Sequence, residues 1–472
     1  MQEKKPNLIY VFADQLRFSS VGFNGDEYAH TPFLDSFSDA CVNMENAVSG
    51  HPVCAPYRAS LLTGKYTTGG TGMVINELRI NPNHRTLAHV LTENGYGTSY
   101  IGKWHMYAAQ LGHHYDTKNS YIPKGENRLG FDEYFAAYNF HHEYYAPKAY
   151  YHLDSPEKIY CKGYEPDDQT DLAIERIRAH KVDGRPFALF LSYGTPHDPW
   201  TRENVPEEYY DLFCDTEFPV PPNYKAHNDP HADGWARFLP GKRKKLNDWK
   251  RAYYAMVANL DDNVARLWTF IKEQGLADNT IFVFTSDHGE MFGAHGRHAK
   301  NIFYEESVRV PFLIKWGDRL PAGRNQTPVN TVDIAPTLLS LLGLPALQSA
   351  QGVDLSDAVR SGAFRKNDCL LMGTGPTAIY GNGTEWRGIR SERFTYAVYK
   401  AGKQEFLFDN LQDPYQQHNL IRDPAFADTV NALRAEMYAK MDAVGDKFRW
   451  NSYYQRHWVK DRKILVTTGE EK

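Results

Sequence analysis

The stretch NLIYVFADQ (residues 7–15) shows the pattern that decides the fold. Its apolar run is typical of a strand buried on both faces of a parallel sheet, and it ends abruptly at Asp14 and Gln15. Three later stretches, 97–105, 185–199 and 279–290, also run from apolar to polar residues, ending in Lys103 and His105, in His197 and Asp198, and in Asp287, His288 and Glu290. We therefore expect four buried strands that each deliver polar side chains at their carboxyl ends.

Helical patterns alternate with these strands, at 86–97, 169–181 and 248–276. Strands that alternate with helices predict an α/β fold, in which a large, mostly parallel sheet is sandwiched by helices. In such sheets ligands bind outside the carboxyl ends of the strands. The polar residues that end the four predicted strands should therefore meet at one edge of the sheet and form a site.

The pattern changes near residue 366, where short strands and turns replace the alternation and a helical stretch follows at 426–444. This predicts a catalytic domain at 1–365 and a smaller C-terminal α+β subdomain, an antiparallel sheet plus a helix, at 366–472. Two long connections, 106–168 and 201–245, do not fit the alternation, and connections of this length are often functional. The first is rich in Tyr and His, and the second ends in a basic run that we interpret as a solvated surface.

The bulk composition excludes several classes of protein. The chain has 472 residues and a net charge of −5, whereas a nucleic-acid-binding protein usually carries a basic excess, so we expect no nucleic-acid partner. We also expect no membrane span, because no apolar run is long enough. The five cysteines form no C-x-x-C pair, which excludes a zinc ribbon or a thioredoxin-like motif. The polar start QEKKPN resembles a mature end left by signal-peptide removal and favours a periplasmic or extracellular protein, with a cytoplasmic one as the alternative.

The stretch HPVCAPYRASLLTG (51–64) predicts a helix that begins at Cys54. Pro56 suits the first turn, where its missing N–H costs nothing, and Gly64 can end the helix. Cys54 would then lie where free N–H groups and the helix dipole favour negative charge, with the cation of Arg58 one turn further on. The alternative interpretation is an ordinary buried cysteine that packs as a small hydrophobic residue.

The polar residues at the predicted sheet edge have a consistent chemistry. The carboxylates of Asp14 and Asp287 suit a hard cation such as Ca²⁺ or Mg²⁺; Gln15 can add a carbonyl oxygen, and His288 is a less natural ligand. Five further side chains supply positive donors around the cysteine: Arg58, Lys103, His105, His197 and Lys300. Such a set stabilises an oxyanion, which suits transfer of a sulfuryl or phosphoryl group.

The sequence resembles the type I sulfatases of the alkaline phosphatase superfamily over nearly its whole length. The most specific part is CAPYRASLLTG (54–64), which is similar to the C-x-P-x-R signal for conversion of cysteine to formylglycine. Five further motifs follow in the order typical of that family: GKWH (102–105), TPHDP (195–199), SDHGEMFGAHG (286–296), HAKNIFYEESVRVPF (298–312) and TVDIAPTLLSLLGLP (331–345).

The resemblance implies a mechanism. Cys54 would be oxidised to formylglycine by a formylglycine-generating or sulfatase-maturing enzyme, and its hydrate, a gem-diol, would attack sulfur with one hydroxyl and expel sulfate with the other. One Ca²⁺ would be bound by Asp14, Gln15, Asp287, His288 and the modified Cys54. The remaining roles implied by the family are these: Arg58 steadies the gem-diol, Lys103 and Lys300 hold sulfate oxygens, His105 assists elimination, and His197 protonates the leaving alcohol.

Two departures from the family pattern keep alternatives open. Many sulfatases have a second Asp where this chain has Gln15, and Asn or Asp where it has His288; both variants also resemble choline sulfatases and phosphonate monoester hydrolases. Lys103 and His105 are retained, which favours a sulfate ester over a phosphonate or phosphodiester. The aromatic insertion favours a sulfated polysaccharide or oligosaccharide as substrate, and makes 106–168 the first place to expect sugar contacts. A scaffold that only binds sulfated glycans is the non-enzymatic alternative.

Overall fold

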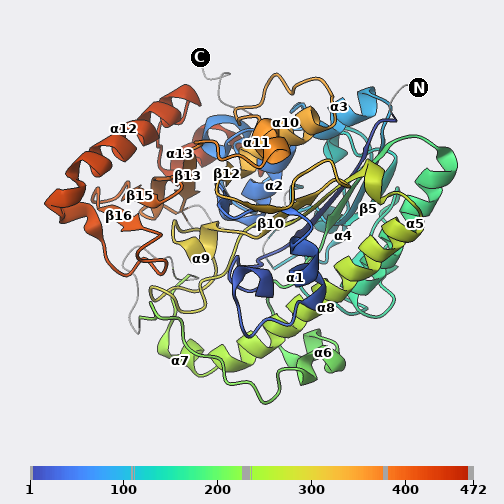
Figure 1. Ribbon diagram of the computed structural model, residues 1–472, viewed down its shortest axis with the longest axis horizontal. Helices are drawn as coiled ribbons and strands as arrows, with labels where there is room; N and C mark the ends of the chain where they lie inside the picture. Colours follow the sequence, from blue (N-terminus) through green and yellow to red (C-terminus); the bar gives the residue numbers. More distant parts are fainter. Residues whose placement is uncertain are drawn as a thin grey trace.

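The computed structural model describes residues 4–107, 110, 112–225, 234, 236–375 and 381–465. Its centre is an eight-stranded sheet flanked by helices (Figure 1). In spatial order the strands are β11 (Gly323–Asn325), β2 (Val42–Met44), β10 (Phe312–Lys315), β9 (Thr280–Ser286), β1 (Asn7–Ala13), β8 (Phe187–Ser192), β4 (Gly97–Lys103) and β5 (Tyr134–Tyr138). The prediction of a large, mostly parallel sheet is confirmed.

The four strands predicted from the sequence lie side by side in this sheet. Strands β9, β1, β8 and β4 are consecutive neighbours and pair in parallel, whereas β10 is antiparallel to both of its neighbours. Because parallel neighbours end at the same edge, the residues that follow these four strands converge there. The order of the strands in space therefore builds the site.

Both faces of the sheet are buried, which explains the unbroken apolar runs. Along β1, Leu8, Tyr10 and Phe12 belong to one hydrophobic core, and the intervening Ile9 and Val11 belong to another. The first core is closed mainly by α2 (Cys54–Thr63), α3 (Leu87–Glu93) and α10 (Thr331–Leu341), and the second by α1 (Pro32–Ser38), α5 (Glu165–Asp183) and α8 (Leu246–Glu273). The alternation of side chains along the strand thus separates two layers of helices (Figure 1).

The C-terminal part contains a second, four-stranded antiparallel sheet. Its strands are β13 (Cys369–Thr374), β14 (Glu385–Arg390), β15 (Phe394–Tyr399) and β16 (Glu405–Asp409), and helix α12 (Ala427–Ala443) packs against it (Figure 1). The predicted antiparallel sheet with its helix is confirmed. The chain then returns to the large domain, because Tyr454, Trp458 and Ile464 are part of the first core of the main sheet.

The remaining elements are short. The helices are α4 (Thr117–Ser120), α6 (Glu207–Asp211), α7 (Pro240–Arg243), α9 (Glu305–Val308), α11 (Ser356–Ser361) and α13 (Asn451–His457), and the strands are β3 (Ala47–Val48), β6 (Tyr150–Tyr151), β7 (Ile159–Tyr160), β12 (Val329–Asn330), β17 (Val459–Lys460) and β18 (Lys463–Ile464). Across the described ranges, no helix has the length and apolarity needed to cross a membrane.

The end of β4 differs from a fully extended segment, in which Lys103 and His105 would lie on the same side of the chain. The strand instead ends at Lys103, and His105 has a left-handed φ of 55°. Just before the turn, Gly102 has φ 99°, and a Cβ there would lie 2.0 Å from the carbonyl oxygen of Ser192. Only glycine permits this close approach of β4 to β8.

Candidate active site

Four strand ends supply the site, as the sequence predicts. Asp14 follows β1 directly, Lys103 is the last residue of β4, His197 lies in the loop after β8, and Asp287 follows β9 directly. All four side chains are buried. The backbone also ties the loops together, because the N–H of Asp287 donates to the carbonyl of Ala13 at 3.1 Å. Buried charged groups from four strand ends therefore lie together at this edge of the sheet.

Asp14 is the centre of the charge network. Its Oδ2 accepts hydrogen bonds from Lys103 Nζ at 2.6 Å and Arg58 Nη2 at 3.1 Å. Burial would raise the pKa of Asp14, but the surrounding cations Lys103, His197, Lys300 and Arg58 outweigh it and hold the pKa well below its usual range. Asp14 is therefore an ionised carboxylate whose Oδ1 is directed towards the centre of the site, 3.5 Å from Cys54 Sγ.

Helix α2 presents Cys54 as predicted. The helix begins at Cys54 and ends before Gly64, which has φ 65°. The preceding Val53 offers no side-chain cap; instead Asn76 Oδ1 accepts the N–H of Ala55 at 3.1 Å. The capping residue lies on a distant segment, and no local sequence signal identifies it.

Arg58 is fixed by contacts from three directions. Its Nη1 donates to the carbonyl of Lys103 at 2.7 Å and to Ser192 Oγ at 2.6 Å, and its Nη2 donates to Asp14. The guanidinium also lies 4.8 Å from the ring centroid of Phe12. Ser192 is a functional contact that sequence reasoning missed, since a serine at the end of an apolar strand carries no distinctive signal.

The surroundings of Cys54 are polar. Its Sγ lies 3.2 Å from His288 Nε2 and 3.3 Å from Lys300 Nζ. Burial and Asp14 raise the pKa of the thiol, but Lys103, Lys300 and His288 together lower it well below its usual value. By contrast, burial raises the pKa of Cys41 to about 12. Cys41 fits the description of a small buried hydrophobic residue, whereas Cys54 does not.

A group of ligand atoms could hold a metal ion. The ligand atoms of Asp14, Cys54, Asp287 and His288 all lie within 4.8 Å of one another. Burial and the charge of Asp14 raise the pKa of Asp287 to about 6, since two buried carboxylates face each other. His288 Nδ1 lies 3.0 Å from the carbonyl of Gly289 and donates to it, which turns Nε2 towards the group. These residues fit a divalent cation, whose charge would relieve the repulsion.

Gln15 completes this group, and Glu290 sets the direction of its amide. Gln15 Nε2 donates to Glu290 Oε2 at 2.8 Å, while its Oε1 accepts from Lys300 Nζ at 2.6 Å. The other oxygen of Glu290 accepts the backbone N–H groups of Phe292 and Ala299. The amide oxygen is therefore directed towards the centre of the site. Glu290 ends a predicted strand region, but sequence reasoning gave it no role.

His197 and Lys300 are hydrogen-bonded to each other, with 2.8 Å between Nε2 and Nζ. Burial and the Lys300 ammonium oppose protonation of His197, but the carboxylates of Asp198 and Asp14 outweigh them and raise its pKa to about 9. A bond of this length requires a lone pair on one of the two nitrogens, so the pair holds one transferable proton between them. The ring of His197 stacks on His142, with centroids 3.9 Å apart and planes at 7°.

His105 lies at the same centre despite its unexpected backbone. Burial lowers the pKa of His105 to about 3, although the neighbouring Cys54 favours its protonation. Its ring packs on Phe140 at 4.3 Å between centroids, and Lys103 Nζ lies 5.0 Å from the same ring. His105 is thus neutral and can accept a proton. Phe140 and His142 belong to the insertion at 106–168, of which residues 108, 109 and 111 lie outside the described part.

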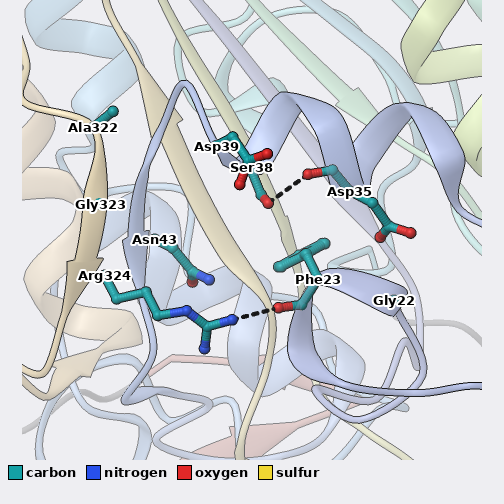
Figure 2. A pocket seen from close by; sticks show the side chains of 9 residues that line it. All are labelled: Gly22, Phe23, Asp35, Ser38, Asp39, Asn43, Ala322, Gly323 and Arg324. Carbon is teal, nitrogen blue, oxygen red and sulfur yellow. Dashed lines mark hydrogen bonds between the residues drawn. The ribbon is translucent and has the colours of Figure 1, made fainter.

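A separate cavity of about 410 Å³ lies on the flank of the molecule between α1 and β11 (Figure 2). Arg324 Nη2 donates to the carbonyl of Phe23 at 2.8 Å, and within α1 Ser38 Oγ donates to the carbonyl of Asp35 at 2.7 Å. Its lining includes none of the predicted site residues. The convergent charges are therefore at the sheet edge and not at this cavity.

Comparison with known proteins agrees with this geometry. A model of the sulfatase family matches residues 6–344. The chain belongs to the sulfatase family. A model of the C-terminal part of N-sulphoglucosamine sulphohydrolase matches residues 293–443 of this sulfatase. The predicted membership is confirmed, and the enzyme is a sulfuric ester hydrolase.

Similar proteins align over most of their length. The sulfatase is 36% identical over 459 residues to an ulvan-active sulfatase of Formosa agariphila, covering 96% of this chain and 84% of that protein. It is 27% identical over 472 residues to an arylsulfatase of Clostridium perfringens, covering 93% and 95%. The crystal structure of yidJ from Bacteroides fragilis superposes with a TM-score of 0.81 at 30% identity, covering 96% of this chain and 99% of that one.

Substitutions at positions 15 and 290 test whether Glu290 fixes the direction of the Gln15 amide. In Glu290→Gln the new NH₂ group faces that of Gln15, so the Gln15 amide must turn its own NH₂ group towards Lys300. We expect divalent-cation affinity to fall by at least about tenfold, as for loss of a group that orients a ligand. The measurement is calorimetric titration of chelator-treated protein with Ca²⁺.

The double variant Gln15→Glu/Glu290→Gln is the matched control. It restores the hydrogen bond between positions 15 and 290 with donor and acceptor reversed, leaves Lys300 donating to an oxygen at position 15, and keeps the charge of the native pair, so affinity should return to within a few-fold. If the double variant binds no better than Glu290→Gln, this account of the pair is wrong.

Proposed function

We propose that this sulfatase removes sulfate from a carbohydrate, with formylglycine derived from Cys54 and one Ca²⁺ ion. The observation that carries the proposal is the position of the His197–Lys300 pair. Lys300 Nζ lies 2.8 Å from His197 Nε2 and 3.3 Å from Cys54 Sγ. His197 and the nucleophile position therefore both lie within reach of Lys300, so that a proton held by the His197–Lys300 pair is close to the reacting centre, as displacement of a poor leaving group requires.

The proton held near His197 favours a sugar as the leaving group. The alkoxide of a sugar is far more basic than a phenolate, so its departure needs a proton more strongly. His197 shares a proton with Lys300 and is held by Asp198, whose Oδ1 lies 3.1 Å from Nδ1. The similarity to an ulvan-active sulfatase, at 36% identity, supports a sulfated polysaccharide or oligosaccharide as substrate.

The cations of the site have complementary tasks. Formylglycine, when hydrated, supplies two hydroxyl groups on one carbon, one to attack sulfur and one to expel sulfate. The charge of Lys103 acts on Cys54, and Lys300 Nζ lies 3.3 Å from its Sγ; both ammonium groups would bind the equatorial oxygens of the sulfate. Arg58, locked by Ser192 and Asp14, would hold the modified residue in place. The neutral His105 would take the proton that is released during elimination of sulfate.

Calcium fits the ligand chemistry of the site. The carboxylates of Asp14 and Asp287 and the amide oxygen of Gln15 are hard ligands, and formylglycine and calcium are typical of this family. The ion would neutralise the facing carboxylates and draw charge from a sulfate oxygen. His288 would add a nitrogen ligand, which calcium binds less well than oxygen. We therefore expect His288 to contribute least to the Ca²⁺ affinity.

Maturation of Cys54 is the first test. When the sulfatase is produced together with a formylglycine-generating or sulfatase-maturing enzyme, peptide mass spectrometry should show Cys54 as the aldehyde. Cys54→Ala should lower kcat/KM by at least ~10³-fold, as expected for loss of a nucleophile. The exposed Cys214 gives the control, since Cys214→Ala should change nothing. Full activity in protein with an unmodified thiol would contradict the proposal.

Removal of the ion is the second test. A chelator should abolish turnover, and Ca²⁺ should restore it. Asp287→Asn should weaken Ca²⁺ binding more than His288→Gln, because it removes a charged oxygen ligand, and calorimetric titration measures both. Restoration by Zn²⁺ alone, or a larger loss in His288→Gln, would argue against calcium at this site.

The leaving group is the third test. His197→Ala should lower kcat/KM for a sulfated sugar by about 10²-fold or more but slow an aryl sulfate only modestly, because a phenolate leaves without a proton. The assay compares sulfated sugars, 4-nitrophenyl sulfate and an aryl phosphonate ester.

Lys103→Ala provides the matched comparison. It should slow sugar and aryl sulfates equally, since its contact is with the sulfate group common to both. If the native enzyme prefers the phosphonate ester by orders of magnitude, a sulfate ester is not its substrate, and the phosphonate hydrolase alternative takes its place.

A further inference from the structure

A pocket of about 360 Å³ lies between two segments that leave the active site. One wall comes from residues 143–148, directly after His142, and the other from 199–204, directly after Asp198. The residues that line it are Glu143, Tyr145, Ala146, Pro147, Lys148, Pro199, Thr201, Glu203 and Asn204. Its volume falls within the range of small-molecule sites. We call it the Tyr145 pocket.

The Tyr145 pocket is joined to the proton donor by short contacts. Asn204 lines the pocket, and its Nδ2 donates to the carbonyl of His142 at 3.1 Å and to that of Pro199 at 3.2 Å. The ring of His142 in turn stacks on His197 at 3.9 Å. Both walls therefore start within two residues of the stacked imidazoles. The pocket is therefore joined to His197 through two contacts, one from Asn204 to the backbone of His142 and one between the two imidazole rings.

The lining combines apolar rings with a few polar groups. Tyr145, Pro147 and Pro199 supply rigid, largely apolar surface, and Tyr offers such contact at a low cost in conformational entropy. Thr201 and Glu203 supply exposed polar atoms beside this surface, whereas the amide of Asn204 is already engaged by the backbone of Tyr144, His142 and Pro199. An alternation of apolar faces and hydroxyl partners is the chemistry that a pyranose ring presents.

The charge of the Tyr145 pocket argues against a second sulfate. Glu143 is already engaged, because Lys148 forms an ion pair with it and the hydroxyl of Tyr115 donates to its Oε2 at 2.7 Å. The exposed carboxylate of Glu203 accepts a hydrogen bond from the Thr201 hydroxyl but has no cation partner among the lining residues, so two carboxylates and one ammonium leave the lining with one net negative charge. A sulfated or uronic ring would meet repulsion there, while a neutral ring would not.

We propose that the Tyr145 pocket is a subsite for a neutral sugar ring attached to the sugar that carries the scissile sulfate. The proposal rests on the proposed function, since it assumes a carbohydrate substrate, and adds to it a second ring and its position. It predicts that the enzyme distinguishes a sulfated monosaccharide from the same sugar extended by one neutral hexose. The gain comes from the pocket and leaves the chemistry at sulfur unchanged.

The experiment uses the mature enzyme and three probes. These are 4-nitrophenyl sulfate, the sulfated monosaccharide with the highest kcat/KM in a screen of sulfated hexoses, and that monosaccharide linked to one neutral hexose. Tyr145→Ala should lower kcat/KM for the disaccharide by about tenfold and change the other two by less than about twofold. Tyr145→Phe keeps the ring and should match the native enzyme. Tyr160→Ala removes a tyrosine that is 51% exposed on β7 and does not line the pocket, and it should leave all three rates unchanged.

A second measurement separates binding from turnover. The inactive Cys54→Ala protein and the double variant Cys54→Ala/Glu203→Ala are titrated with the disaccharide by calorimetry. Because Glu203 is exposed, its loss should not disturb folding, and we expect it to weaken disaccharide binding several-fold while monosaccharide binding is unchanged.

The outcomes separate the two proposals. If the native enzyme hydrolyses sugar sulfates but Tyr145→Ala affects monosaccharide and disaccharide equally, or neither, the subsite is overturned and the proposed function stands. If the native enzyme hydrolyses 4-nitrophenyl sulfate and no sugar sulfate, the proposed function fails and the subsite fails with it.

Discussion

The rest of the site depends on a carboxylate that is both buried and ionised. Asp14 has no access to solvent, and a buried charge without partners is so costly that the group would normally take up a proton. Lys103 and Arg58 prevent this by donating to the same oxygen, Oδ2. Loss of either partner would leave an uncompensated charge, a change that costs about 3–5 kcal/mol in buried pairs. The ion pairs therefore bind three elements, β1, β4 and α2, into one unit.

The same requirement explains why the strand order matters. Lys103 and Asp14 are separated along the chain by almost ninety residues, and they meet only because β8 lies between β1 and β4 and aligns their ends. Gly102 allows the end of β4 to approach the Ser192 carbonyl closely. Ser192 Oγ in turn accepts a hydrogen bond from Arg58. A single close approach of two strands thus positions both cations on Asp14.

The pair formed by Gln15 and Glu290 fixes the direction of a neutral side chain in the ligand group. The carboxylate of Glu290 accepts hydrogen bonds from two backbone N–H groups and from the Gln15 amide. The amide then presents only its oxygen to the centre. Its direction is fixed from both ends, by Glu290 on one side and Lys300 on the other, which limits the reorganisation needed when a ligand binds.

The sequence by itself determined the elements and most of the charged groups of the site. Strands buried on both faces are continuous apolar runs, a property of short segments, so β1, β4, β8 and β9 could be predicted together with the residues that end them. The start of α2 at Cys54 and its end at Gly64 are likewise local. The left-handed φ of 55° at His105 was not predicted, since the sequence at 97–105 shows only an apolar run that ends in polar residues. The partners Asn76, Ser192 and Glu290, the stack of His142 on His197, and the return of Trp458 to the main core were decided only by the tertiary structure. Each of these contacts joins segments that are far apart in the chain. A side chain whose partner lies on a distant segment shows no periodicity or spacing in the sequence from which the contact could be predicted.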